Sequence, residues 1–165
     1  MAISLPRQPT KKVTVSKLVI TFIALFTAIS PYVADFNDPH VYNPYWPGHA
    51  KFHNGQTMTL GLISGGLSLY FLWLRKASTG LENLKMSCLF AALYWLAMFP
   101  AIAYPGATLT DPHQNGRPMD YIHGYAFTQL HIDFILVLIL GACFWVESNR
   151  LTVSDQRPVP DTLTH

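Results

Sequence analysis

Asp133 is the side chain whose place in the sequence most clearly indicates a chemical role. It lies between Ile132 and Phe134 in an apolar segment long enough to cross a bilayer. A carboxylate there costs several kcal/mol unless it faces the interior of a helix bundle and finds a partner, so such an acid indicates a functional site. Gln129 and Tyr125 precede it by one and two helical turns on the same face. We predict that Asp133 is a general acid or base, the alternative being a structural hydrogen bond to another helix.

A pair of histidines, His49 and His53, is spaced four residues apart. Both lie on one face of a helix if that helix begins near Pro47. We predict that the pair lies opposite Asp133 and takes part in the same acid-base chemistry. The spacing is also common among metal ligands, although the glutamate of the zinc-protease motif is missing. A metal site of His49, His53 and His131, a haem held between facing helices, or histidines that merely bond the loops are therefore alternatives.

A second polar stretch, residues 110–133, supplies further candidates. Asp111 and Asp120 flank Arg117, and an arginine between two carboxylates holds one ionised while the other stays protonated. A solvated loop is the simpler interpretation. His131 lies two positions before Asp133 and therefore points to another side of the helix. The predicted catalytic residues are Asp133, His49, His53, Asp111 and Asp120, and the predicted pocket residues are Asn43, Trp46, Gln56, Arg117, His123, Tyr125, Gln129 and His131.

Four apolar segments must position these side chains. They cover about residues 18–33, 55–74, 84–104 and 125–146, and each approaches the ~20 residues that a helix needs to cross ~30 Å of hydrocarbon. Hydrophobic residues make up 50% of the chain and charged residues only 12%, against about a quarter charged in soluble domains. We predict an all-α, polytopic membrane four-helix bundle over residues 17–148, with a basic leader at 1–16 and a disordered tail at 149–165.

The basic residues predict the orientation of this bundle. Nine of the 11 lie in residues 1–17, in the 75–85 connection or after residue 149, and the other two are Lys51 and Arg117. By the positive-inside rule both termini are then cytosolic, and the two long connections lie together on the external or lumenal side. Six of the seven histidines fall at that end. We therefore expect a polar pocket on the lumenal side of the endoplasmic reticulum membrane.

The remaining sequence features narrow the class of protein. A net charge of +2 with no long basic tract argues against nucleic acid as a partner. Cys88 and Cys143 lie in apolar runs and indicate neither a disulfide framework nor a zinc motif. A stripe of small residues on the second segment favours close helix packing; it consists of Gly61, Ser64, Gly65 and Ser68.

These observations favour a small membrane enzyme that applies acid-base chemistry to a lipophilic substrate without a cofactor. Carboxylates and imidazoles at one end of the bundle suit epoxide opening or an isomerisation. The alternatives are a histidine-ligated metal or haem protein and a non-catalytic membrane bundle, against which the intramembrane Asp133 counts. The lipid bilayer and a second copy of the chain are the other expected partners.

Two short motifs in the first connection resemble those of a known group of proteins. They are Asn-Pro-Tyr-Trp-Pro at residues 43–47 and His-Ala-Lys-Phe-His at residues 49–53. With the four-span layout, they resemble small multi-pass membrane proteins of fungi, some of which are similar to the epoxide hydrolases of aurovertin-, citreoviridin- and asteltoxin-type polyene-polyketide biosynthesis. The resemblance covers residues 17–148 and carries no catalytic motif that can be assigned residue by residue. It implies a secondary-metabolite enzyme in which water or an internal hydroxyl opens an epoxide. Sterol-isomerase-like proteins are similar in architecture, and a resemblance to them implies glutamates within the membrane. In this sequence both glutamates, Glu82 and Glu147, are expected at the cytosolic end instead.

Overall fold

The computed structural model describes residues 12–76, 78–109, 121–122 and 125–155. Its helices are α1 (Val15–Asp35), α2 (Gly48–Leu69), α3 (Gly80–Ala101) and α4 (Gln129–Asp155), and a π-helical turn, η1 (Tyr70–Leu74), continues α2. Two short strands, β1 (Tyr121–Ile122) and β2 (Tyr125–Ala126), pair antiparallel between α3 and α4. The predicted all-α class is confirmed, and the described residues contain four helices long and apolar enough to cross a membrane.

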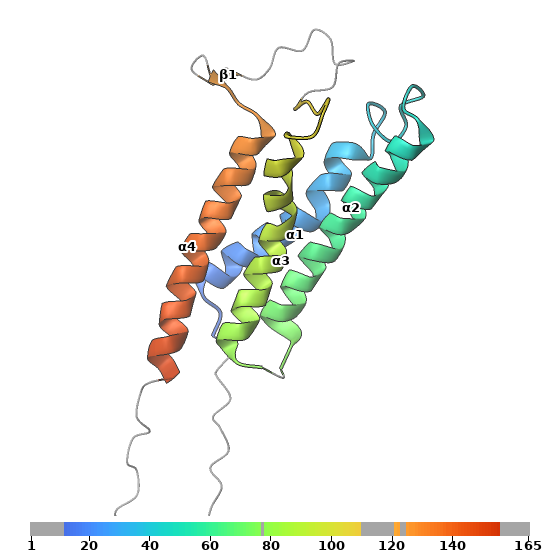
Figure 1. Ribbon diagram of the computed structural model, residues 1–165. Coiled ribbons are helices and arrows are strands. Elements are labelled where there is room, and N and C mark those ends of the chain that lie inside the picture. The colour runs from blue at the N-terminus through green and yellow to red at the C-terminus, as the bar shows by residue number, and fades with distance from the viewer. Residues whose placement is uncertain (1–11, 77, 110–120, 123–124, 156–165) are drawn as a thin grey trace, which may run out of the picture.

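The helices form a bundle in which α3 lies between α2 and α4, and α1 crosses behind α3 (Figure 1). α1 runs from the lower part of α4 to the upper part of α2, so it packs against both. The connections α1–α2 and α3–α4 lie together at one end, which we call the loop end. The opposite end holds the η1–α3 turn and both ends of the described chain. We call it the basic end, because the side chains there include Lys17, Arg75, Lys76, Lys85 and Arg150.

The small-residue stripe of α2 permits close helix packing, as predicted, and its two glycines lie directly against α1. A Cβ added to Gly65 would lie 2.8 Å from Ala28 Cβ, and one added to Gly61 would lie 2.8 Å from both Pro31 Cγ and the Thr27 carbonyl oxygen. Pro31 has no N–H to bond the Thr27 carbonyl four residues earlier, so that oxygen is available to the Cα–H of Gly61. Only glycine permits this approach of the two backbones.

Several helix ends differ from the ends of the predicted apolar segments. α2 begins at Gly48, next to Pro47 as the histidine spacing required and seven residues before its apolar segment, because Pro47 starts a helical turn that the polar residues after it continue. α4 begins at Gln129, because Tyr125 and Ala126 pair with β1 instead. α4 also continues to Asp155, so residues 149–155 of the predicted disordered tail are helical. The extension holds because Leu151 packs on the core and lies against Gly80.

The buried core is small, and it lies where α1, α3 and α4 meet. Its buried members are Ile20, Ile23, Leu84, Cys88, Ala91 and Leu140. Most large apolar side chains of the helices point outward instead, including Phe22, Leu62, Phe134 and Trp145. Four apolar helices with an apolar outer surface are typical of a multi-pass membrane protein.

Candidate functional site

Asp133 is fully buried, with 0% of its surface exposed. The prediction that it faces the interior of the bundle is confirmed. Neither of its carboxylate oxygens has a hydrogen-bond partner among the described residues. The Gln129 side-chain amide, one turn earlier on α4, adds a weak hydrogen-bonding interaction outside normal hydrogen-bond geometry, and the Tyr94 side chain on α3 interacts with Asp133 electrostatically. A buried carboxylate without a full set of partners is costly to the fold, which is typical of a site that serves a ligand or a reaction.

Glu147 provides an internal comparison for Asp133. The buried residues Asp133, Leu140 and Glu147 recur every seven positions along one narrow stripe of α4. Glu147 is 1% exposed, but its carboxylate accepts hydrogen bonds from Thr14 Oγ1 at 2.8 Å and from Arg150 Nη2 at 2.5 Å, and Lys17 Nζ lies 3.9 Å away. Glu147, at the basic end, therefore belongs to an ordinary structural ion pair, whereas Asp133, at the loop end, does not.

Three further polar side chains, one from each of the other helices, are linked to Asp133 through a chain of interactions that runs by way of Tyr94. Asn54 Nδ2 donates a hydrogen bond to Asp35 Oδ2 at 3.0 Å, which joins α2 to the end of α1. Tyr94 is 5% exposed and interacts electrostatically with both Asp35 and Asp133. The Oδ1 atom of Asn54 is buried and has no partner among the described residues. We call Asp35, Asn54, Tyr94 and Asp133 the interior polar cluster.

The sequence analysis missed three members of this cluster, although the spacing contains them. Asn54 lies four residues before the buried Met58, which is three before Gly61, so it continues the interior stripe of α2. Asp35 likewise lies four residues after the buried Pro31. Extending the small-residue stripe of α2 by two turns toward the loop end would have found Asn54, whereas Asp35 and Tyr94 lie on α1 and α3 and have no such signal in that stripe.

A cavity of about 220 Å³ lies at the loop end between α3 and α4. Gln129 lines it and donates from Nε2 to the Met98 sulfur at 3.0 Å. Because the same Gln129 side chain interacts with Asp133, the cavity lies next to the interior polar cluster. Its other lining residues are Ala101, Ile102, Ala107, Thr108, Leu109 and Leu130. Gln129 is therefore a predicted pocket residue that lines a cavity beside Asp133.

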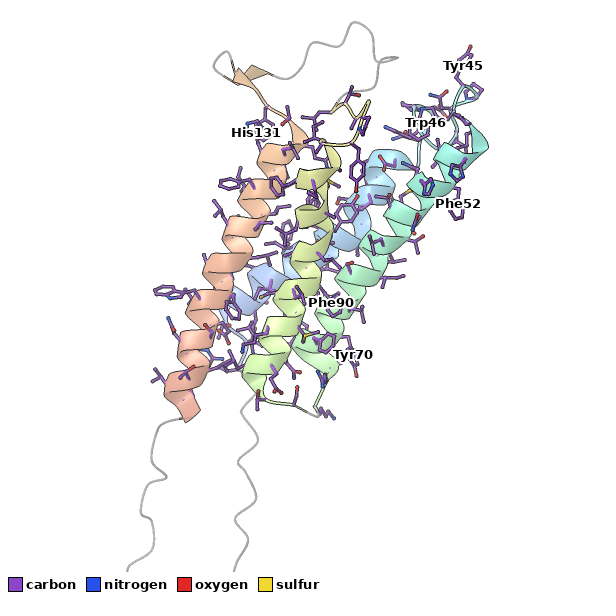
Figure 2. All side chains as sticks on the ribbon, in the orientation of Figure 1. Tyr45, Trp46, Phe52, Tyr70, Phe90 and His131 are labelled. Carbon is purple, nitrogen blue, oxygen red and sulfur yellow. The ribbon has the colours of Figure 1, made fainter. Side chains whose placement is uncertain are left out.

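His49 and His53 do not face Asp133, and that prediction is wrong. Both side chains are exposed on the outer face of α2, and their Nε2 atoms lie 3.0 Å apart. Phe52, on the same surface, is 66% exposed and points away from the bundle in Figure 2. The interior of α2 is taken by Asn54 and the small-residue stripe, so the helix presents the face of His49, His53 and Gln56 outward.

His131 is a helix-capping residue in this structure. It is exposed, its Nδ1 accepts a hydrogen bond from the backbone N–H of Thr128 at 3.1 Å, and its ring stacks on Phe127. It lies on α4, on the far side of α3 from Phe52 and the α2 histidines (Figure 2). The predicted metal set of His49, His53 and His131 is therefore not brought together, and the described residues hold no group of three or more His, Cys, Asp or Glu side chains placed to share a metal ion.

The predicted pocket residues of the first connection have structural roles. Asn43 is buried, donates to the Pro39 carbonyl at 2.9 Å and accepts from the Tyr45 N–H at 2.9 Å, which fixes the turn. Trp46 packs edge-on against His40.

The remaining predicted site residues belong to the connection between α3 and α4. Tyr125 belongs to β2 rather than to α4, so it is not two helical turns before Asp133. The other predicted site residues lie outside the described residues: Asp111, Arg117, Asp120 and His123.

The chain belongs to a family of unknown function, DUF6640, whose model matches residues 19–158. The match covers nearly all of the four helices, including every member of the interior polar cluster. No curated protein matches the chain. No solved structure matches it either.

Proposed function

We propose that this DUF6640 protein is an integral membrane enzyme of the endoplasmic reticulum whose four helices cross the bilayer. The apolar outer surface and the length of the helices support the membrane location. The excess of Lys and Arg at the basic end supports a cytosolic position for that end, which leaves the loop end and the interior polar cluster on the lumenal side.

The proposed chemistry is acid-base catalysis on a lipophilic substrate, and the observation that carries it is Asp133. The buried Glu147 of the same helix is fully paired, whereas both oxygens of Asp133 are unpartnered among the described residues. A carboxylate kept in that state can accept or donate a proton at a bound molecule. Tyr94, which interacts with it, supplies a hydroxyl as the second proton-transfer group.

Epoxide opening is the reaction that fits these two groups, in line with the resemblance to polyketide epoxide hydrolases. A water molecule gives one proton to Asp133 while its oxygen bonds to an epoxide carbon. The bond between that carbon and the epoxide oxygen breaks, and this oxygen takes the proton of the Tyr94 hydroxyl. Proton transfer from Asp133 back to the tyrosinate restores both groups, and the product is a vicinal diol. If a hydroxyl of the substrate replaces water, the same transfers give a cyclic ether.

The lipophilic substrate would reach the cluster from the bilayer, between α3 and α4. An apolar groove of about 360 Å³ lies there, open to the outer surface. Its lining is apolar apart from one histidine and consists of Phe99, Phe127, Leu130, His131, Phe134 and Ile135. An apolar lining at membrane depth suits the hydrocarbon part of a polyene or polyketide substrate.

The test is epoxide turnover by the purified protein in lipid nanodiscs. Polyene epoxides are incubated in H₂¹⁸O, and mass spectrometry of the products distinguishes hydrolysis, which incorporates one ¹⁸O, from cyclisation, which incorporates none. We expect Asp133→Asn to lower the rate by at least about 10²-fold, the scale of a lost general acid or base. Asp38→Asn is the matched control, because Asp38 is an exposed acid at the loop end. Full activity of Asp133→Asn would refute the role of Asp133.

A further inference from the structure

We propose that His49 and His53 form a binding site for a divalent transition-metal ion of tetragonal preference, Cu²⁺ first. The site lies on the outer face of α2 and is independent of the interior polar cluster. It contains two protein ligands, so the remaining coordination positions are open to water or to a small anionic or amine ligand.

The separation of the two ring nitrogens carries this inference. His49 Nε2 and His53 Nε2 lie 3.0 Å apart, with the ring planes at 82°. Two imidazole nitrogens each about 2.05 Å from one ion are about 2.9 Å apart at a right angle and about 3.3 Å apart at the tetrahedral angle. The observed separation, which a hydrogen bond between the two rings sets in the absence of metal, is close to both values, so small ring rotations would let both nitrogens bind one ion. Among divalent first-row ions Cu²⁺ binds nitrogen ligands most tightly, which makes it the preferred ion.

Gln56 holds His53 in the form that a metal ion requires. The Gln56 Oε1 atom lies 3.1 Å from His53 Nδ1. A carbonyl oxygen can only accept, so Nδ1 carries the proton and Nε2 presents its lone pair. In the protein without metal, His49 Nε2–H donates to that lone pair. A ligating histidine commonly bonds its other N–H to an acceptor that fixes the ring, and Gln56 is placed to do this.

The surroundings keep both rings in position on a regular helix. The N–H groups of Ala50 and Lys51 bond the Pro47 carbonyl at 3.0 and 3.2 Å, so the first turn of α2 is already formed at His49. The Phe52 ring stacks on His49, with ring planes 10° apart, and meets His53 edge-on. Both imidazoles are exposed, so an ion can reach them without opening the bundle.

The experiment is a Cu²⁺ titration of the full-length protein, purified in detergent with an affinity tag that contains no histidine. Isothermal calorimetry gives stoichiometry and affinity, and electron paramagnetic resonance counts the equatorial nitrogens. The double variant His49→Ala/His53→Ala defines the background from other histidines. Above it, we expect one tetragonal Cu²⁺ with two imidazole nitrogens, and binding weaker by more than about tenfold in either single variant.

Two further variants separate ligation from folding and from nonspecific binding. Gln56→Ala should weaken Cu²⁺ binding by about tenfold, because the His53 ring loses the acceptor that orients it. His131→Ala should leave the Cu²⁺ affinity unchanged, since that ring lies on α4. The variants at His49, His53 and Gln56, which are exposed helical positions, should keep the thermal stability of the wild type. Wild-type affinity in His53→Ala, a single equatorial imidazole, or tighter binding of Zn²⁺ than of Cu²⁺ would overturn the proposal.

Discussion

Replacing Asp133 by leucine should stabilise the protein while it abolishes activity. Leucine has the branching of aspartate without its polar oxygens. In the wild type these oxygens are fully buried and unpartnered among the described residues. An unsatisfied buried polar group costs about 1–3 kcal/mol. Removing that cost should raise the free energy of unfolding by a similar amount, and Tm by about 2–4 °C for each kcal/mol in a chain of this size.

Thermal unfolding in detergent can be followed with a maleimide dye that fluoresces when it reacts with a thiol. Cys88 is buried in the core and becomes reactive only when the bundle opens. Asp38→Leu serves as the control, because an exposed substitution should change stability by less than about 0.5 kcal/mol.

The sign of the stability change decides between the two interpretations of Asp133. If the carboxyl group were bonded to another part of the chain as a structural element, its removal would leave that partner unpaired, and Asp133→Leu would lower Tm. A lower Tm would therefore refute the reasoning from an unpartnered carboxylate. Loss of activity with a raised Tm is the pattern expected of a residue kept for function at a cost in stability.

Three more predictions test the packing and the chemistry. Gly65→Ala should lower the free energy of unfolding by about 1–3 kcal/mol, because its Cβ would lie 2.8 Å from Ala28 Cβ. Gly66→Ala should be neutral or stabilising, since no atom outside its own helix backbone lies within 4 Å of that Cβ; equal Tm values for the two variants would contradict the tight α1–α2 contact. Glu147→Gln should lower the free energy of unfolding by about 1–3 kcal/mol, and so lower Tm in the same dye assay, because Lys17 and Arg150 lose their charged partner; an unchanged Tm would show that this ion pair does not tie α1 to α4. Tyr94→Phe should lower epoxide turnover by about 10²–10⁴-fold with Tm held within a few degrees, and wild-type turnover would remove Tyr94 as the proton donor.

The length and apolarity of the segments determined the fold class. Four segments near 20 residues with few charges can only satisfy their backbone groups as helices, and the structure has four helices close to the predicted places. The small-residue stripe also predicted its own role, since Gly61 and Gly65 permit the close approach of α1 and α2. Asp133 was predictable as an interior residue because a carboxylate cannot face hydrocarbon cheaply.

Only the tertiary structure decided how each helix is rotated about its axis. Periodicity groups His49 with His53 and Asn54 with Met58, but it does not say which group faces the bundle when the helix is apolar nearly all around. The contact of α1 with the small-residue stripe turned the histidines outward and Asn54 inward. The pairing state of the two buried acids of α4 likewise depends on residues far away in the chain. Thr14, 133 positions before Glu147, completes the partners of that acid, and no such group among the described residues reaches Asp133.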